Sequence, residues 1–175
     1  FADTSRTLGT LDPIGREMLL GLGCAVENMV VGAQALGFTP ILNLFPAGAS
    51  GDHIARLTVF PGERTKPPEA AALAKRHTHR GAYARQQGLS RAMVDDLNAQ
   101  LKRSSSRLVW LGADSTAGKH FVEATLEATI AIVVDADMHR DSSAWFRHDL
   151  AQVNKARDGI STSTAGMPAL MTRLA

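Results

Sequence analysis

The sequence predicts a single α+β domain that extends over residues 1–175. Three observations support this fold class: a long apolar segment of helical character near the N-terminus, two short aliphatic runs separated by turn residues, and further helical segments in the second half. A chain of 175 residues is long enough to bury a sizeable core. Helices that alternate with strands in this way are typical of α+β or α/β domains.

The first predicted element is a long helix in the segment "PIGREMLLGLGCAVENMVVGAQALG". Asp12 is expected to cap its N-terminus, because the residue that follows, Pro13, suits the first helical position. Gly37 is expected to end the helix. Since the segment is apolar on most sides, we expect a central helix, in which Cys24, the only cysteine, is a small buried residue.

Two strands and a second helix are predicted next. "TPILNLF" and "HIARLTVF" are rich in aliphatic and aromatic residues, and the turn residues "PAGASGD" separate them. Two strands joined by a loop are the simplest interpretation. After the polar connection "GERTKPP", the segment "PEAAALAKR" begins with Pro68 and continues with good helix formers, which predicts a helix that leads to Arg76.

The second half of the chain is predicted to be mainly helical. Ser90 is expected to cap a helix in "RAMVDDLNAQLKR", where apolar residues recur every four positions. "LVWLG" predicts a short buried strand, and a long helix is expected from about Ala117 to Val134. "SSAWFRHDLAQVNKA" predicts another helix, and the tail "RDGISTSTAGMPAL" is expected to be a loop.

The charge balance restricts the class of partner. The 19 Lys and Arg residues nearly cancel the 17 Asp and Glu residues, which gives a formal net charge of +2. A broad nucleic-acid-binding face is therefore not expected, and any positive site must be local. Polar and acidic residues interrupt the apolar stretches, so we expect no membrane span.

The segment "KRHTHRGAY", residues 75–83, concentrates basic and hydrogen-bonding side chains. His77 and His79 would point the same way on a strand, as two metal ligands do. Zinc requires three or four ligands, however, and no cysteine or carboxylate lies nearby in the sequence. No metal site is therefore expected here.

Two other interpretations of this segment remain open from the residues alone. In the first interpretation, the segment is a solvated loop after a helix, and the basic residues of the loop meet the negative end of the helix dipole. Alternatively, it is an anion clamp, in which Arg76 and Arg80 supply forked donors, Thr78 supplies a hydroxyl and Gly81 permits close approach of the backbone. The spacing does not separate these two interpretations.

A second polar cluster is expected to be an ordinary helix surface. His120, Glu123 and Glu127 share one helical face, as ligands of a carboxylate metal site do, but helical bundles need a second such helix. The sequence contains no phosphate loop, dinucleotide fingerprint or nucleophile elbow.

Four stretches, taken in order, resemble the Acg-type branch of the nitroreductase superfamily, whose bacterial members include proteins with twin-arginine export signals. These stretches are "LDPIGREMLLGLGCAVENMVVGAQALGFTPILNLFP", "HIARLTVF", "KRHTHRGAY" and "RDGISTSTAGMP". The resemblance implies a nitroreductase-like fold, with a mixed sheet and a long central helix that lies at dimer interfaces. Gly15 to Leu36 match that helix.

The resemblance also implies FMN as the cofactor. Nitroreductases bind the FMN phosphate with an R-x-S/T-x-R element, which Arg76, Thr78 and Arg80 match residue by residue. His77, at the second position of the element, would lie near the phosphate or the ribityl chain. The resemblance thus favours the anion clamp over the solvated loop.

The implied activity is electron transfer from NAD(P)H, through the flavin, to a nitro compound or quinone. No catalytic residue is identified. The alternative is a stress-associated protein that binds or sequesters flavin without turnover. A third interpretation is a purely structural module whose basic loop is solvated.

We expect the chain to be an internal fragment of a longer protein. The match begins after the family's N-terminal A-P-S-x-x-N-x-Q-P-W segment and ends before the last segment that closes the flavin site. An incomplete domain of this kind is expected to self-associate or to pair with its missing half. A twin-arginine signal upstream would direct the protein to the periplasm, and without one a cytoplasmic location is expected.

Overall fold

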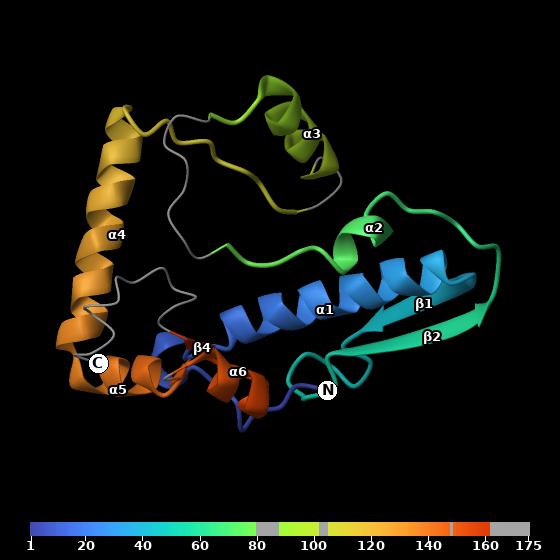
Figure 1. Ribbon diagram of the computed structural model, residues 1–175, viewed down its shortest axis with the longest axis horizontal. Coiled ribbons are helices and arrows are strands. Elements are labelled where there is room, and N and C mark those ends of the chain that lie inside the picture. The colour runs from blue at the N-terminus through green and yellow to red at the C-terminus, as the bar shows by residue number, and fades with distance from the viewer. Residues whose placement is uncertain (80–87, 102–104, 148, 162–175) are drawn as a thin grey trace. The chain divides into compact units, whose positions relative to one another are not determined.

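The computed structural model describes residues 1–79, 88–101, 105–147 and 149–161, and these residues form a mixed α+β structure, as predicted (Figure 1). The chain divides into two compact units, which are described separately. Unit 1 contains Phe1–His79 and Arg140–Ala144, and unit 2 contains the rest of the chain. The nitroreductase-like fold itself stays a prediction.

The long helix α1 (Arg16–Ala35) lies in unit 1, and its N-cap residue is Gly15, whereas the sequence predicted Asp12. The Asp12 Oδ2 atom accepts hydrogen bonds from the backbone N–H groups of Glu17 (2.9 Å) and Met18 (3.1 Å). The helix begins later than Pro13, because Gly15 has a φ of 67° and this left-handed conformation separates the turn at Asp12 from the helix.

The end of α1 agrees with the prediction at Gly37. This glycine has a φ of 89°, and its N–H group donates a hydrogen bond to the Gln34 carbonyl (3.2 Å). Arg64, from the polar connection further along the chain, donates from Nε to the carbonyl of Ala35 at 2.9 Å. A cation at this position also meets the negative end of the helix dipole.

Strands β1 (Phe38–Leu44) and β2 (Ala55–Pro61) form the predicted antiparallel pair. Figure 1 shows α1 lying along this hairpin, and α1 contacts both strands. Side chains alternate between the two faces of a sheet. The face toward α1 carries mainly apolar residues (Leu42, Leu44, Ala55, Leu57), and the other face is more polar (Thr39, Asn43, Arg56, Thr58).

The prediction that α1 is a central, buried helix is wrong for the described structure. Val31 is the buried residue of α1, while Leu20 is 64% exposed. The reason is that α1 rests on a sheet of two strands and on the single turn α2 (Ala70–Leu73), which cover only part of its circumference.

The burial predicted for Cys24 is wrong for the same reason. The thiol is exposed. Leu22 and Val26 line the space between α1 and the hairpin, and Cys24 is two positions from each of them. At about 100° per residue, this spacing places Cys24 on the opposite side of the helix.

Helix α1 also differs from the expectation that no segment of the chain has the length and composition of a membrane span. Its 20 residues include an 18-residue window of mean hydropathy 1.3, so the helix is long and apolar enough to cross a membrane. Mostly buried core helices of soluble proteins and signal sequences near the N-terminus pass the same test, and only 6% of this window is buried.

The N-terminal turn η1 (Gly9–Leu11) is joined to the last turn of α5 (Ala136–Ser143) within unit 1. Asp141 Oδ2 accepts hydrogen bonds from the Thr10 backbone N–H and from the Thr10 hydroxyl, both at 2.8 Å. The backbone hydrogen bond, followed by that of the hydroxyl, holds the pKa of Asp141 below its usual range. This contact connects residues 131 positions apart in the sequence.

Unit 2 contains two of the predicted helices. Helix α3 (Arg91–Leu101) has the predicted cap, since Ser90 Oγ accepts a hydrogen bond from the Met93 N–H at 3.2 Å. Helix α4 (Thr116–Val134) agrees closely with the predicted range, and Ser115 Oγ accepts from the Gly118 N–H at 3.0 Å.

The predicted strand "LVWLG" is not observed. Residues 108–111 adopt no regular structure, and their side chains are 40–66% exposed. Trp110 donates from its indole N–H to Asn98 Oδ1 at 3.1 Å. An apolar run forms a strand only beside another strand, and the described residues provide none here.

The helix predicted for "SSAWFRHDLAQVNKA" is confirmed only for the second half of this segment. Helix α5 ends at Ser143, and strand β3 (Phe146–Arg147) and helix α6 (Leu150–Ala156) follow. Asp149 Oδ1 accepts from the Gln152 N–H at 2.8 Å, so this residue caps α6 and interrupts the continuous helix.

The segment predicted to be a loop after α6 contains strand β4 (Ile160–Ser161), which pairs in parallel with β3. Arg147 donates from Nε and Nη2 to Asp158 Oδ1, at 3.1 and 2.7 Å. This partly buried ion pair joins β3 to the turn before β4. The rest of the predicted loop lies outside the described residues.

Candidate functional site

The segment proposed to bind an anion follows α2 directly. The N–H groups of Lys75 and Arg76 both donate to the Ala72 carbonyl, at 3.0 and 2.8 Å, so the helical turn extends beyond Leu73. The predicted helix therefore leads to Arg76 as expected, although it is only a short one. Four residues in α2 are too few for a strong helix dipole at this end.

The predicted cofactor-binding residues Arg76, His77 and Thr78 are all exposed, and Arg80 lies outside the described residues. In the part of the chain that the structure describes, the side chains of Arg76 and Thr78 form no hydrogen bond or ion pair. His77 Nδ1 lies 3.4 Å from the Lys75 carbonyl oxygen. The donors of Arg76 and Thr78 are therefore available to a ligand, and they are equally accessible to water.

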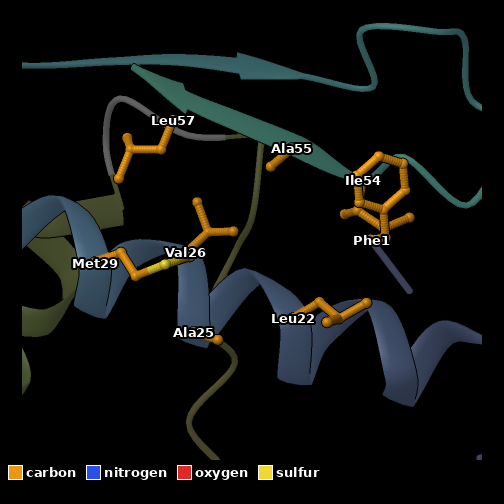
Figure 2. A pocket seen from close by; sticks show the side chains of 8 residues that line it. All are labelled: Phe1, Leu22, Ala25, Val26, Met29, Ile54, Ala55 and Leu57. Atoms are coloured by element: carbon orange, nitrogen blue, oxygen red, sulfur yellow. The ribbon is translucent and has the colours of Figure 1, made fainter. Parts of the chain in front are cut away.

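An apolar cavity of about 180 Å³ lies between α1 and β2 in unit 1. Figure 2 shows side chains of α1 and of the β2 strand lining it, together with Phe1 from the N-terminus. The lining side chains are Phe1, Leu22, Ala25, Val26, Met29, Ile54, Ala55 and Leu57. None of them is ionisable, so this cavity suits an apolar group and offers no acid–base chemistry.

A second cavity, of about 330 Å³, lies on the β1 side of α1. Leu19, Val26, Leu42 and Leu44 are among its lining residues, and Glu27 contributes an ionisable group. A third, of about 200 Å³, lies beside the N-terminal residues. The linings of these three cavities do not include Arg76, His77 or Thr78.

Sequence reasoning did not identify these cavities. The sequence signal related to these cavities is the alternation of apolar residues in β1 and β2 beside an apolar helix. That pattern predicts that the helix and the strands pack together, but it does not indicate where the packing leaves a cavity.

His120, Glu123 and Glu127 lie exposed on α4. Among the described residues, no three His, Cys, Asp or Glu side chains come together as metal ligands.

Two curated proteins of Mycobacterium tuberculosis are similar to this chain. Each is named "Putative NAD(P)H nitroreductase", one from strain CDC 1551 / Oshkosh and the other from strain ATCC 25618 / H37Rv. Each is 34% identical over 86 residues, which cover 48% of this chain. No family model matches the chain, and no solved structure matches it significantly.

The matched region covers 25% of the length of each relative. Sequence identity of 34% across 86 residues is more than composition alone produces. Over this region, about half of its length, the chain is homologous to the nitroreductase family.

Proposed function

We propose that this chain is part of an FMN-dependent, nitroreductase-like oxidoreductase of the Acg type, which transfers electrons from NAD(P)H to a nitro compound or quinone. The observation that carries the proposal is the homology to two proteins named as NAD(P)H nitroreductases. Residues Arg76, His77, Thr78 and Arg80 are proposed to hold the phosphate of FMN.

The described part of this segment fits a phosphate. A phosphomonoester carries a charge of about −1.5 to −2 near pH 7, and the exposed Arg76 offers a guanidinium fork that binds two of its oxygens. The Thr78 hydroxyl supplies another donor. FMN would supply hydride and electron transfer when bound, whereas these residues bind and orient its phosphate.

Ligand discrimination in the full-length protein tests the proposed phosphate site. Hydrogen bonds to charged groups contribute roughly 1.5–3 kcal/mol each, so Arg76→Ala should weaken FMN binding by about ten- to a hundredfold. Riboflavin lacks the phosphate, and its binding should change little. Arg76→Lys should recover part of the loss, because an ammonium retains the charge without the fork.

Arg56→Ala is the matched control, because it removes an exposed arginine from β2, away from the segment. Both flavins are titrated by fluorescence quenching. Equal effects of Arg76→Ala on FMN and riboflavin, or an effect no larger than that of Arg56→Ala, would show that the segment is a solvated loop.

Anaerobic mixing of the flavin-loaded protein with NADPH tests turnover. An oxidoreductase should lose its oxidised flavin absorbance and regain it after addition of a nitro compound or quinone. Retention of the oxidised spectrum would instead indicate a protein that binds or sequesters flavin.

A further inference from the structure

Residues 1–11, which we call the N-terminal strap, are attached near one end to the loop between β1 and β2. The Ala2 N–H donates to the Asp52 carbonyl oxygen at 2.7 Å, and Ala2 is only 8% exposed. The Phe1 ring stacks on His53, with ring centroids 4.3 Å apart. This attachment, the loop anchor, therefore combines a backbone hydrogen bond with a ring contact.

The other end of the strap is attached to α5 through Asp141. The Oδ2 atom of Asp141 accepts hydrogen bonds from both the N–H and the hydroxyl of Thr10, each at 2.8 Å. The Asp141 side chain is 20% exposed, and Arg140 Nη2 lies 3.3 Å from its Oδ1 atom. Hydrogen bonds to an ionised carboxylate are shorter and stronger than those between neutral groups. We call this contact between Asp141 and Thr10 the latch.

Gly9 makes room for the latch. Its φ of 56° lies in the left-handed region, and a Cβ atom added there would overlap the carboxylate of Asp141. Relief of that overlap requires the Asp141 side chain to move, and a displaced carboxylate loses its hydrogen bonds to Thr10. The pair Gly9–Thr10 thus admits the carboxylate and binds it.

Hydrogen bonds within the strap keep its middle part folded on itself. Asp3 Oδ1 accepts from the N–H and the hydroxyl of Ser5, at 3.1 and 2.6 Å. The Arg6 N–H donates to the Asp3 carbonyl at 3.1 Å, and the Leu11 N–H donates to the Leu8 carbonyl at 3.1 Å. These local hydrogen bonds need not break when the two ends are released, and local opening of proteins occurs in contiguous units of this kind.

We propose that the N-terminal strap is a conformational device that opens and closes as one unit, with the contact between Asp141 and Thr10 as its latch. Release of the latch also releases the loop anchor, while α1 and the hairpin stay folded. Asp12, which follows the strap, remains bonded to the first turn of α1. Phe1 lines the cavity of Figure 2 and Thr4 lines the cavity beside the N-terminal residues, so opening of the strap removes part of the wall of each.

Hydrogen exchange measured by NMR in the 175-residue chain tests the coupling between the two ends. Asp141→Ala removes the latch, so the Ala2 N–H at the other end of the strap should exchange about tenfold faster. The Phe45 N–H, which donates to the Ile54 carbonyl at 2.8 Å, should keep its rate. An unchanged rate at Ala2 would overturn the proposal. Equal acceleration at Ala2 and Phe45 would also overturn it, because unit 1 would then open as a whole.

Gly9→Ala tests the latch without changing Asp141. The added methyl group should displace the carboxylate and accelerate exchange at Ala2 about as much as Asp141→Ala does. Gly15→Ala is the matched control, because Gly15 also has a positive φ, 67°, but its Cβ would meet only the end of the Met18 side chain, at 3.3 Å.

The double variant Gly9→Ala/Asp141→Ala separates the latch from backbone strain. Two substitutions that act on the same contact are not additive, so Gly9→Ala should accelerate exchange at Ala2 much less in the Asp141→Ala background than in the parent chain. Additive effects, or equal acceleration by Gly9→Ala and Gly15→Ala, would show that strain at the glycine is the cause and would overturn the role of Asp141 as the latch.

Discussion

The same substitution at two helical glycines should have opposite effects on stability. Gly118, in the first turn of α4, is buried, and a Cβ atom added there would overlap the carbonyl oxygen of Gly112. That carbonyl also accepts a hydrogen bond from Ser115 Oγ (2.7 Å), the group that caps α4. Gly23, in α1, has nothing within 4 Å of an added Cβ atom.

The expected magnitudes follow from these surroundings. Alanine stabilises a helix interior by about 0.8–1 kcal/mol relative to glycine, so Gly23→Ala should raise the free energy of unfolding by up to that amount. In Gly118→Ala, overpacking costs about 1–3 kcal/mol and disturbance of the Ser115 cap costs about 0.5–2 kcal/mol. A net loss of about 1–3 kcal/mol is therefore expected.

Urea denaturation followed by far-ultraviolet circular dichroism measures both variants against the parent chain. Hydrogen exchange over residues 112–120 and 16–30 then assigns each change to α4 or to α1. A Gly118→Ala variant as stable as Gly23→Ala would refute the close packing of Gly118 against Gly112.

Two further predictions concern acidic side chains. Asp12→Ala should destabilise the start of α1 by about 1 kcal/mol, measured by urea denaturation, because it removes the acceptor for Glu17 and Met18; Asp12→Asn keeps an acceptor oxygen and should cost much less. The Asp141–Thr10 contact should stabilise unit 1 at pH values above the pKa of the unfolded carboxyl, and this contribution should be lost as the pH falls through the lowered folded-state pKa. In an acid titration of unfolding, the difference in stability between the parent chain and Asp141→Asn should therefore be largest above the ordinary pKa of an aspartate and should shrink below it. Identical titrations of the two proteins would contradict this prediction.

Local chemistry made several elements predictable from the sequence. Ser90 caps its helix as expected, and Asp12 accepts a hydrogen bond from the first turn of α1 although Gly15 holds the N-cap position. A short polar side chain before a helix satisfies N–H groups whatever lies beyond it. Gly37 ends α1 because its left-handed conformation suits glycine. The hairpin was predictable because alternation and turn residues act over short range.

Long-range packing explains what could not be predicted. Burial of Cys24 depends on what covers the far side of α1, and the sequence of the helix carries no information about that. "LVWLG" has the composition of a strand but no strand beside it in the described structure. For the candidate site, the residue types of the basic segment were recognisable, whereas the choice between a phosphate clamp and a solvated loop depends on a ligand-binding measurement.

The contact between Thr10 and Asp141 has a consequence for the order of folding. Ten residues separate β1 from β2, whereas this contact joins positions 131 apart. Loop-closure entropy grows by about 0.6 kcal/mol for each doubling of length, so the distant contact costs about 2 kcal/mol more to close than the hairpin. During synthesis, α1 and the hairpin can therefore pair early, while the N-terminal turn acquires its partner only after Asp141 has left the ribosome.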